Sequence, residues 1–254
     1  PHSARGRTAL STMPKPALNL QTTTLWHYPS QHYREGAHGD SEYRGATPSW
    51  VIWNLLERYT VEDELVIDPM AGSGTTLDVA REMKRRALAY DLAPTRSEVF
   101  RADARALPLE DGKACFVFVD PPYGDNLQYS GQADCIGELP ADGTDYWRAM
   151  DDVLSEVFRV LRPGRHAAFY VCDIWKRRGF VPLGARLAVL IEKRFEMVDH
   201  VAVVRGNKDL LKGNYRKAAE ETNFFLRGFN HLLIFRKPEA KAGKAIPRDT
   251  RQRR

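Results

Sequence analysis

Four aspartates in the first half of the chain each stand at the end of a short apolar stretch: Asp68, Asp91, Asp103 and Asp120. Short apolar stretches bounded by turn residues are typical of buried strands, so each carboxylate is predicted to lie at the carboxyl end of a strand. In an open α/β sheet, ligands bind outside those ends. One aspartate after a strand is an ordinary turn residue, but four in succession predict a binding site.

The segment from Pro69 to Thr76 reads Pro-Met-Ala-Gly-Ser-Gly-Thr-Thr and predicts a tight turn that leads into a helix. Gly72 and Gly74 permit positive φ angles and let the backbone approach a ligand closely. The segment lacks both the G-x-G-x-x-G of dinucleotide-binding folds and the G-x-x-x-x-G-K-[ST] of phosphate loops. It is therefore predicted to bind a ligand that carries no phosphate.

The two aspartates that follow this loop indicate which ligand that is. Asp91 comes roughly twenty residues after the glycine turn, where a carboxylate accepts hydrogen bonds from ribose hydroxyls. Asp103, at the end of the next predicted strand, is placed to accept a hydrogen bond from an adenine amino group. A ligand with ribose and adenine but no phosphate is S-adenosyl-L-methionine, which we expect as the cofactor.

The fourth aspartate opens the tetrapeptide Asp120-Pro121-Pro122-Tyr123, in which a carboxylate, a rigid backbone and an aromatic ring are adjacent. An exocyclic amino nitrogen of a base is a poor nucleophile, because its lone pair is delocalised into the ring. Hydrogen bonds to the Asp120 carboxylate and the Pro121 carbonyl would localise that lone pair and aim it at a methyl donor. The prolines stiffen the loop, and Tyr123 offers a face for stacking a base that has left its helix.

Together the glycine segment and the tetrapeptide resemble the amino-methyltransferases, S-adenosylmethionine enzymes that methylate exocyclic amino nitrogens of bases. Their two hallmarks, D-P-x-x-G-S-G-T-T and D/N/S-P-P-Y/F/W, occur here at residues 68–76 and 120–123. The resemblance extends over about residues 47–237 and implies that the tetrapeptide Asp120, Pro121, Pro122 and Tyr123 is catalytic. The cofactor contacts that it implies are Thr47, Pro48, Asp68, Pro69, Ala71, Gly72, Ser73, Gly74, Thr75, Thr76, Asp91, Asp103 and Ala104.

The order of the motifs resembles the gamma arrangement, in which a segment that completes the methionine pocket, here Ala46–Pro48, precedes the cofactor loop. Gamma enzymes usually add a large target-recognition domain, and none fits here. Residues 124–142 and 205–227 carry polar, cationic and aromatic side chains and are predicted to contact DNA instead. The DNA-binding candidates are Asn126, Tyr129, Lys208, Lys212, Arg216, Lys217 and Arg227.

The stretches between these motifs predict an α/β fold, because strand-length apolar runs alternate with amphipathic helices. The resemblance implies a Rossmann-like class I methyltransferase: a seven-stranded, mostly parallel sheet with a C-terminal antiparallel strand pair. Helices are expected at Pro48–Thr60, Thr75–Lys84, Thr144–Leu161 and Leu183–Lys193, with Thr47 as the first N-cap and Pro163-Gly164 ending the third. Strands are expected at Leu65–Ile67, Ala87–Tyr90, Val99–Phe100, Cys115–Val119, Ala167–Val171, Glu196–Val204 and His231–Arg236.

The charge pattern predicts a single domain between two basic ends. The chain has 254 residues and a formal net charge of +5, and Lys and Arg are concentrated at both ends. We expect a basic flexible tail over residues 1–24, one catalytic domain over residues 25–237, and a second basic flexible tail over residues 238–254. Within the domain, residues 205–227 are the expected DNA-contacting insertion. The aromatic stretch over residues 25–34 is expected to fold over the active site or a partner subunit.

Several classes of protein are excluded by what the sequence lacks. Cys115, Cys135 and Cys172 are far apart, which argues against a disulfide scaffold or a zinc ribbon and favours a reducing compartment. No apolar run approaches the roughly 18 residues of a membrane helix, and no apolar signal core is seen. The histidines show no metal-ligand spacing. We therefore expect a cytoplasmic, nucleoid-associated protein with no metal and no membrane partner.

The function predicted from these features is DNA amino-methylation, at adenine N6 or cytosine N4 of a flipped base. A homodimer on duplex DNA is expected, because so short a chain offers only part of the surface of a sequence-specific DNA interface. One alternative is a transfer-RNA guanine-N2 methyltransferase, which the residues Asp-Pro-Pro-Tyr-Gly also resemble. A second alternative is a cofactor-binding regulatory subunit without activity, against which the intact tetrapeptide argues.

Overall fold

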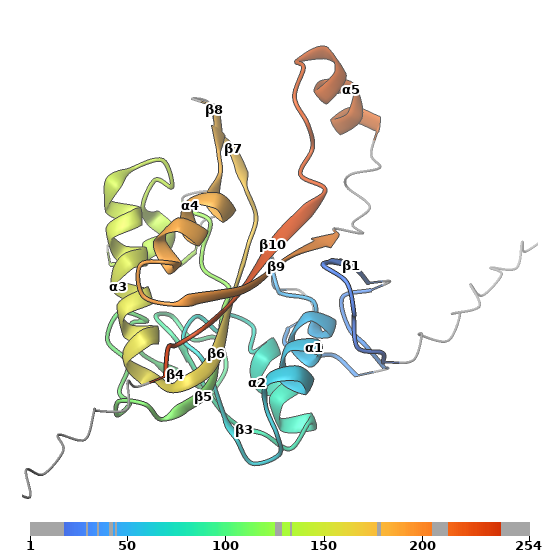
Figure 1. Ribbon diagram of the computed structural model, residues 1–254. Helices are drawn as coiled ribbons and strands as arrows, with labels where there is room; N and C mark the ends of the chain where they lie inside the picture. The colour runs from blue at the N-terminus through green and yellow to red at the C-terminus, as the bar shows by residue number, and fades with distance from the viewer. Residues whose placement is uncertain are drawn as a thin grey trace, which may run out of the picture.

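A mixed β-sheet with helices on both faces forms the body of the molecule (Figure 1). The computed structural model describes residues 18–28, 30–34, 36–40, 43, 45–124, 129–132, 134–176, 179–204 and 213–239. Within these residues the strands are β1 (Leu25–His27), β2 (Leu65–Asp68), β3 (Arg86–Asp91), β4 (Val99–Arg101), β5 (Ala114–Val119), β6 (Leu161–Val171), β7 (Ile174–Lys176), β8 (Gly179–Val181), β9 (Glu196–Val204) and β10 (Phe229–Arg236). The helices are α1 (Ser49–Tyr59), α2 (Thr75–Glu82), α3 (Thr144–Val160), α4 (Leu183–Ile191) and α5 (Gly213–Glu221), with a 3₁₀ turn at Ile136–Glu138.

The strand order of the main sheet is β1-β9-β10-β6-β5-β2-β3-β4. Its pairs are parallel except those of β10, which runs antiparallel to both β6 and β9. The predicted α/β class and C-terminal antiparallel pair are therefore confirmed. The sheet has eight strands and not the expected seven, because β1 adds to the outer edge of β9. β7 and β8 form a separate two-stranded ribbon.

The central strand β5 shows how one short sequence builds two cores. Every residue of β5 is buried, and successive side chains point to opposite faces of the sheet. Val117 and Val119 pack with α3 and α4, while Phe116 and Phe118 pack with α1 on the other face. Both faces being covered explains why the strand reads as a continuous apolar run.

The ends of two predicted elements differ from the structure for local reasons. Pro48, not Thr47, is the N-cap of α1, because the Thr47 hydroxyl is used in a hydrogen bond to Asp120. β6 begins at Leu161, immediately after α3, so Pro163 and Gly164 lie inside a strand. Gly164 adopts a φ of 76° there, and its N–H donates to the Lys237 carbonyl at 2.9 Å.

The N-terminal aromatic residues pack on the body of the molecule. Trp26 and Tyr33 are 2% and 0% exposed, and the Tyr28 ring stacks on Trp50 of α1 with centroids 5.6 Å apart. The Gln21 N–H donates to Asn54 Oδ1 at 2.8 Å, although residue 21 falls in the predicted tail. This stretch therefore covers α1 and the β9 edge and not the active site.

No helix among the described residues is long and apolar enough to cross a membrane.

Candidate active site

A cavity of about 200 Å³ lies at the carboxyl ends of β2, β3 and β5. All four aspartates that the sequence places after strands line it: Asp68, Asp91, Asp103 and Asp120. The parallel order of the central strands explains this, because each of these strands ends at the same edge of the sheet. The expected convergence of the four carboxylates on one site is thus what the structure shows.

The glycine loop after β2 is held by hydrogen bonds that its main-chain N–H groups donate. The Gly72 N–H donates to Asp91 Oδ2 at 2.9 Å, and the Ala71 N–H donates to the Tyr90 carbonyl at 2.9 Å. Gly72 has a φ of 46°, and a Cβ there would lie 2.9 Å from the Tyr43 hydroxyl. Glycine is therefore required both by the backbone angle and by the ring that packs over the loop.

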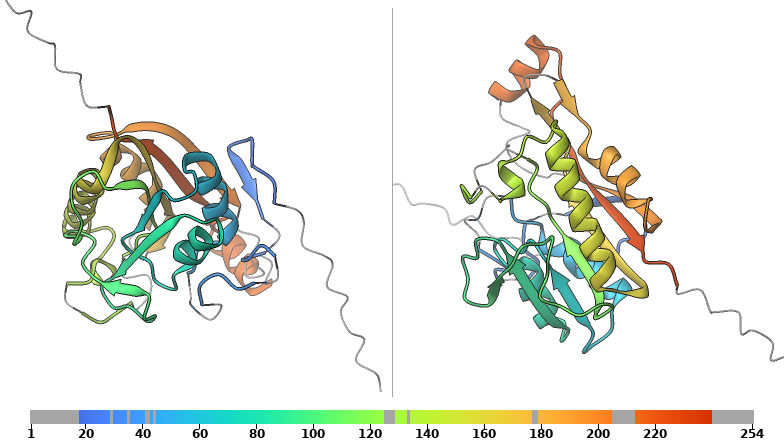
Figure 2. Two further views of the ribbon diagram at one scale, coloured as in Figure 1. Left: turned by 90° about the horizontal axis from the view of Figure 1, so that it is seen from below. Right: turned by 90° about the vertical axis from the view of Figure 1, so that its left-hand side faces the viewer.

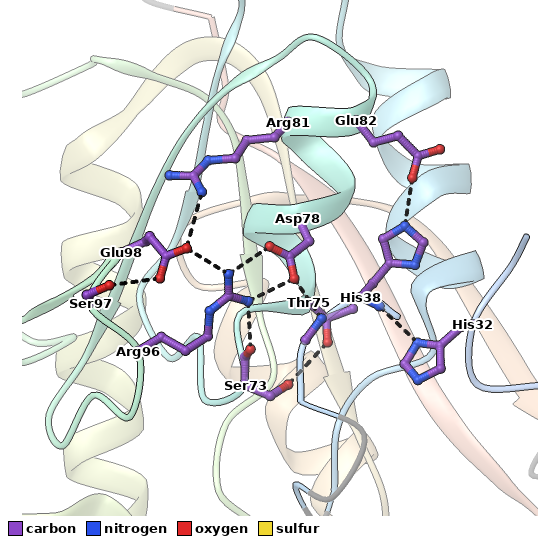
Figure 3. Close-up of polar contacts among 11 residues, drawn as sticks. His32, His38, Ser73, Thr75, Asp78, Arg81, Glu82, Arg96, Ser97 and Glu98 are labelled. Carbon is purple, nitrogen blue, oxygen red and sulfur yellow. Dashed lines mark hydrogen bonds and ion pairs between the residues drawn. The ribbon is translucent and has the colours of Figure 1, made fainter. Parts of the chain in front are cut away.

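A second polar network, which includes Arg96 and Asp78, also supports the glycine loop (Figure 3). Arg96 donates to both carboxylate oxygens of Asp78 on α2, at 2.8 and 3.0 Å, and to the Ser73 carbonyl at 3.2 Å. Asp78 also accepts from the Gly39 N–H at 2.7 Å. One carboxylate thus joins α2, the segment between β3 and β4, and the chain before α1. His38, beside Gly39, contacts Glu82 on the same helix at 2.7 Å.

Both oxygens of the Asp120 carboxylate, the catalytic candidate, accept hydrogen bonds. The Thr47 hydroxyl donates to Asp120 Oδ2, and the Tyr123 hydroxyl donates to Oδ1 at 3.1 Å. The loop itself is fixed from two directions: the Tyr123 N–H donates to the Tyr129 hydroxyl at 3.2 Å, and the Tyr146 hydroxyl donates to the Pro122 carbonyl at 2.8 Å. The carboxylate is therefore oriented before any substrate arrives.

Burial changes the acidity of two of the aspartates. Burial raises the pKa of Asp120 to about 7, although hydrogen bonds from Thr47 and Tyr123 oppose the rise. Burial also raises the pKa of Asp68 to about 7, against hydrogen bonds from Thr76 and the Met70 N–H. Both carboxylates face a cavity whose described lining contains no Lys, Arg or His. A ligand with its own positive charge would stabilise them as anions, and the sulfonium of S-adenosylmethionine is such a ligand.

Asp103 lies in a different environment. Burial raises its pKa, but hydrogen bonds from Arg105 outweigh that effect, so the pKa of Asp103 is held below its usual range. Arg105 contacts both carboxylate oxygens, at 2.6 to 3.1 Å, and also donates to the Asp134 carbonyl at 2.9 Å. Asp103 therefore lines the cavity and also orients Arg105, which contacts Asp134.

The other predicted site residues divide by position. Of the cofactor candidates, Pro48 and Gly74 do not line the cavity: they are the N-caps of α1 and α2. The lining residues among the predicted set are Thr47, Asp68, Pro69, Ala71, Gly72, Ser73, Thr75, Thr76, Asp91, Asp103, Ala104, Asp120, Pro121, Pro122 and Tyr123. The residues' roles as ligands stay predictions.

The DNA-binding candidates are dispersed. Tyr129 lines the cavity, and Arg216 and Lys217 lie on α5, where Lys217 is 3.6 Å from Glu221. Arg227 lies over the Phe180 ring, 5.1 Å from its centroid. Asn126, Lys208 and Lys212 fall outside the described residues.

Lining residues outside the predicted catalytic, cofactor and DNA-binding sets include Tyr43, Asp134, Cys135 and Ile136. They lie on irregular segments before α1 and after the catalytic loop, where periodicity gives no signal. Burial raises the pKa of Tyr43 to about 12, with Asp91 and Asp120 adding to the effect. Among the described residues, no group of three His, Cys, Asp or Glu side chains is arranged to hold a metal ion.

Comparison with known proteins gives one family match, which covers the cofactor side of this site. The N6_N4_Mtase family model, described as DNA methylase, matches residues 7–101, which include the glycine loop and Asp91. No curated protein matches the sequence.

Solved structures with a similar fold include the [4+2]-cyclase SpnF, at 16% identity over 80% of this chain and 88% of that chain, with a TM-score of 0.50. A chain of the Haloferax volcanii complex that contains the Trm112 methyltransferase activator matches at 14% identity over 73% and 87%, with a TM-score of 0.51. A Thermus thermophilus protein described as a DNA modification methylase matches at 22% identity over 55% and 52%, with a TM-score of 0.39. The first two likenesses show the fold.

Proposed function

We propose that this chain, an S-adenosylmethionine-dependent DNA methyltransferase of the N6/N4 type by its family match and fold, methylates the exocyclic amino group of a flipped adenine or cytosine. The match of residues 7–101 to the DNA methylase family model supports the expected family resemblance, enzyme class and cofactor. The observation that carries the proposal is the position of Asp120. Its carboxylate faces the same cavity as the glycine loop and Asp91.

In this proposal different residues bind different parts of the cofactor. Asp91 binds the ribose hydroxyls, the glycine loop lies against the nucleoside, and Asp68 with Thr47 borders the methionine part. When bound, S-adenosylmethionine supplies an electrophilic methyl group on a positively charged sulfur. The two carboxylates of raised pKa, Asp68 and Asp120, favour that charge over a neutral ligand.

Asp120 and Pro121 act on the base. The amino group donates one hydrogen bond to the Asp120 carboxylate and one to the Pro121 carbonyl, which localises the nitrogen lone pair. Each carboxylate oxygen has two acceptor positions, so Asp120 accepts from the amino group while Thr47 and Tyr123 still hold it. A pKa of about 7 also suits Asp120 to take the proton that the nitrogen loses on methylation.

Tyr123 has two tasks in this proposal. Its hydroxyl donates to Asp120, which fixes the plane of the ring, and a fixed ring offers a stable face to a base. The ring packs against the core cluster that contains Tyr146 and Ile136, so that its position is set before the base enters.

The same proposal includes DNA as a duplex and two copies of this chain. Specific protein–DNA interfaces bury on the order of 1,000–2,500 Å² of protein, and a single short insertion offers only part of that area. A symmetric dimer would double the surface and favour a palindromic target. Light scattering with and without DNA tests this: a dimer in the DNA complex is expected, and a monomer in both states would remove it.

Mass spectrometry of nucleosides tests the activity. Duplex DNA and transfer RNA are each incubated with the protein and S-adenosylmethionine, then digested. N6-methyladenine or N4-methylcytosine in DNA is expected with the wild type and is absent with Asp120→Asn. N2-methylguanine in RNA would instead favour the transfer-RNA alternative, and no methylated nucleoside at all would favour the inactive regulatory subunit.

A further inference from the structure

Aromatic rings gather on the ribbon β7–β8 and the segment that follows α5. Trp175 of β7 lies 6.3 Å from Phe180 of β8 and 6.4 Å from Phe224, measured between ring centroids, and stacks on the latter. The Arg227 guanidinium covers the other partner, 5.1 Å from the Phe180 centroid. We call Trp175, Phe180, Phe224, Phe225 and Arg227 the aromatic platform.

The platform is open to solvent. Trp175 is 55% exposed, Phe180 44% and Phe225 84%, whereas Trp26 and Trp50 are buried in the core. Large apolar side chains that cluster on a surface mark an interaction site more often than a structural one. Helix α5, next to the platform in the chain, has no buried residue. A nine-residue helix is marginally stable without packing, so both features point to a missing partner.

The platform lies on the substrate side of the sheet. β7 follows β6 after two residues, and β6 is the neighbour of β5, which leads into the Asp120 loop. β7, β8 and α5 extend beyond the carboxyl edge of the sheet, and residues at that edge line the cavity (Figures 1 and 2). A long ligand that reaches Asp120 from this side passes the platform.

The sequence segments that carry the platform are rich in positive charge. Residues 175–180 and 205–227 contain nine Lys and Arg and three Asp and Glu, a net charge of +6, while the whole chain carries +5. The remainder of the chain is therefore close to neutral overall. Cations interleaved with exposed aromatic rings suit a polyanion whose subunits have flat faces, which is a nucleic acid. A protein partner with an apolar face would not need this charge.

We propose that the aromatic platform stacks against unpaired bases of DNA beside the flipped target, while cations of the same sequence segments bind the flanking phosphates. This rests on the proposed function, which delivers an opened DNA segment to Asp120. Stacking on aromatic rings tolerates any base, because every base has a flat face. The platform therefore recognises the opened state of DNA and not its sequence.

Binding measured by fluorescence anisotropy tests the proposal. The ligands are a labelled duplex with a short unpaired bubble, the same duplex fully paired, and single-stranded RNA of the same sequence. Trp175→Ala and Phe225→Ser are compared with the wild type, and Phe100→Ala is the control because Phe100 is equally exposed, at 52%, on the distant edge strand β4. Phe225→Ser is included because an 84% exposed side chain is removed with little effect on folding.

Each platform variant is expected to bind the bubble duplex about 5- to 100-fold more weakly, since stacking contributes that much per base, and the paired duplex with little change. Quenching of Trp175 emission by the bubble duplex is expected as well and is lost in Trp175→Phe. Equal loss on both duplexes, or no loss on either, would overturn the proposal. So would tighter binding of RNA than of the bubble.

Failure of the platform is distinguishable from failure of the proposed function. If the wild type methylates DNA while the platform variants bind the bubble duplex normally, the platform assignment is wrong and the methyltransferase assignment stands. If the wild type neither methylates nor binds any DNA, the proposed function itself is wrong, and the platform assignment falls with it.

Discussion

The hydroxyl of Thr47 donates a hydrogen bond to the carboxylate of Asp120, although the two residues are 73 positions apart in the chain. Both side chains lie in the cavity wall, where Thr47 is 5% exposed. The contact joins the segment before α1 to the catalytic loop after β5. It also stabilises the ionised form of a carboxylate whose burial favours the neutral form. Thr47 is thus a positioning residue for Asp120.

Replacing Thr47 with valine should shift the pH dependence of methyl transfer upward. Loss of the hydrogen bond raises the pKa of Asp120 further above about 7, and only the ionised carboxylate accepts a hydrogen bond on each oxygen. A hydrogen bond to a charged group contributes about 1.5–3 kcal/mol, so the midpoint should move by about 1–2 pH units. The initial rate as a function of pH measures it. Thr47→Ser should restore the wild-type profile; an unshifted valine profile would contradict the role.

Replacing Asp120 with asparagine should abolish methyl transfer and leave the affinity for S-adenosylhomocysteine close to that of the wild type. The amide keeps the shape of the side chain but replaces one acceptor oxygen with a donor, which opposes the amino group of the base. A radiolabelled methyl-transfer assay and calorimetric titration of S-adenosylhomocysteine measure the two effects. Because the product lacks the sulfonium charge, its affinity separates site shape from electrostatics. Retained activity would exclude Asp120 as the catalytic group.

Replacing Asp91 with alanine should weaken cofactor binding about tenfold to a hundredfold. The ribose hydroxyls lose their acceptor, which costs roughly 1.5–3 kcal/mol, and the Gly72 N–H loses the bond it makes at 2.9 Å. Isothermal titration with S-adenosylmethionine measures the dissociation constant. Asp111→Ala is the control, since Asp111 is exposed and pairs with Arg159 away from the cavity. An unchanged dissociation constant would mean that Asp91 only holds the glycine loop and does not bind the ribose.

Two glycines three residues apart, Gly36 and Gly39, provide a matched test of the contact between the 36–40 segment and the glycine loop. Gly39 has a φ of 73°, and a Cβ there would lie 2.5 Å from the Ser73 hydroxyl, whereas a Cβ at Gly36 meets nothing within 4 Å. Gly39→Ala should therefore lower stability by about 1–3 kcal/mol and weaken cofactor binding, while Gly36→Ala does neither. Thermal unfolding with and without S-adenosylhomocysteine measures both. Equal behaviour of the two variants would show that the Gly39 contact is dispensable.

Asp68 should lower the stability of the cofactor-free protein at neutral and alkaline pH. Its folded pKa of about 7 lies above the ordinary value of 3.8, so folding is favoured by the protonated form. This contribution is complete below about pH 4 and is lost as the pH rises to about 7. Asp68→Asn should therefore raise the free energy of unfolding at pH 8 by up to about 4 kcal/mol, with little difference at pH 4. The melting temperature at each pH measures this change. A variant less stable than the wild type at pH 8 would contradict this.

The convergence of the four aspartates was predictable because it depends only on strand order and direction. Local periodicity placed β2, β3 and β5, and the rule that parallel strands share a carboxyl edge did the rest. The clamp on Asp120 was not predictable in the same way. It joins Thr47 to a residue on another strand, and no spacing in the sequence encodes such a contact. Thr47 was therefore assigned to the cofactor and to the cap of a helix.

Two features escaped prediction, one because it depends on a distant segment and one because a nearby side chain competes for the carboxylate. The ribbon β7–β8 has strands of three residues, too short for alternation to be recognised, and its rings meet Phe224 from a distant segment. The pairing of Asp103 with Arg105 changes the expected character of that carboxylate, since its oxygens already accept from a guanidinium. A binding partner for adenine was predicted there, and the structure shows a tether to Asp134 as well.

The two outermost strands of the sheet limit how copies of this chain can associate. β1 and β4 are three residues each, and the β4 border offers only a few unpaired main-chain groups to a neighbouring sheet. On the other side β1 pairs only with Ala202–Val204 of the nine-residue β9, so the earlier residues of β9 form the border there. Short borders disfavour sheet-to-sheet polymerisation. In the dimer proposed above, side chains and not main-chain pairing at the β4 border would then recognise the second copy.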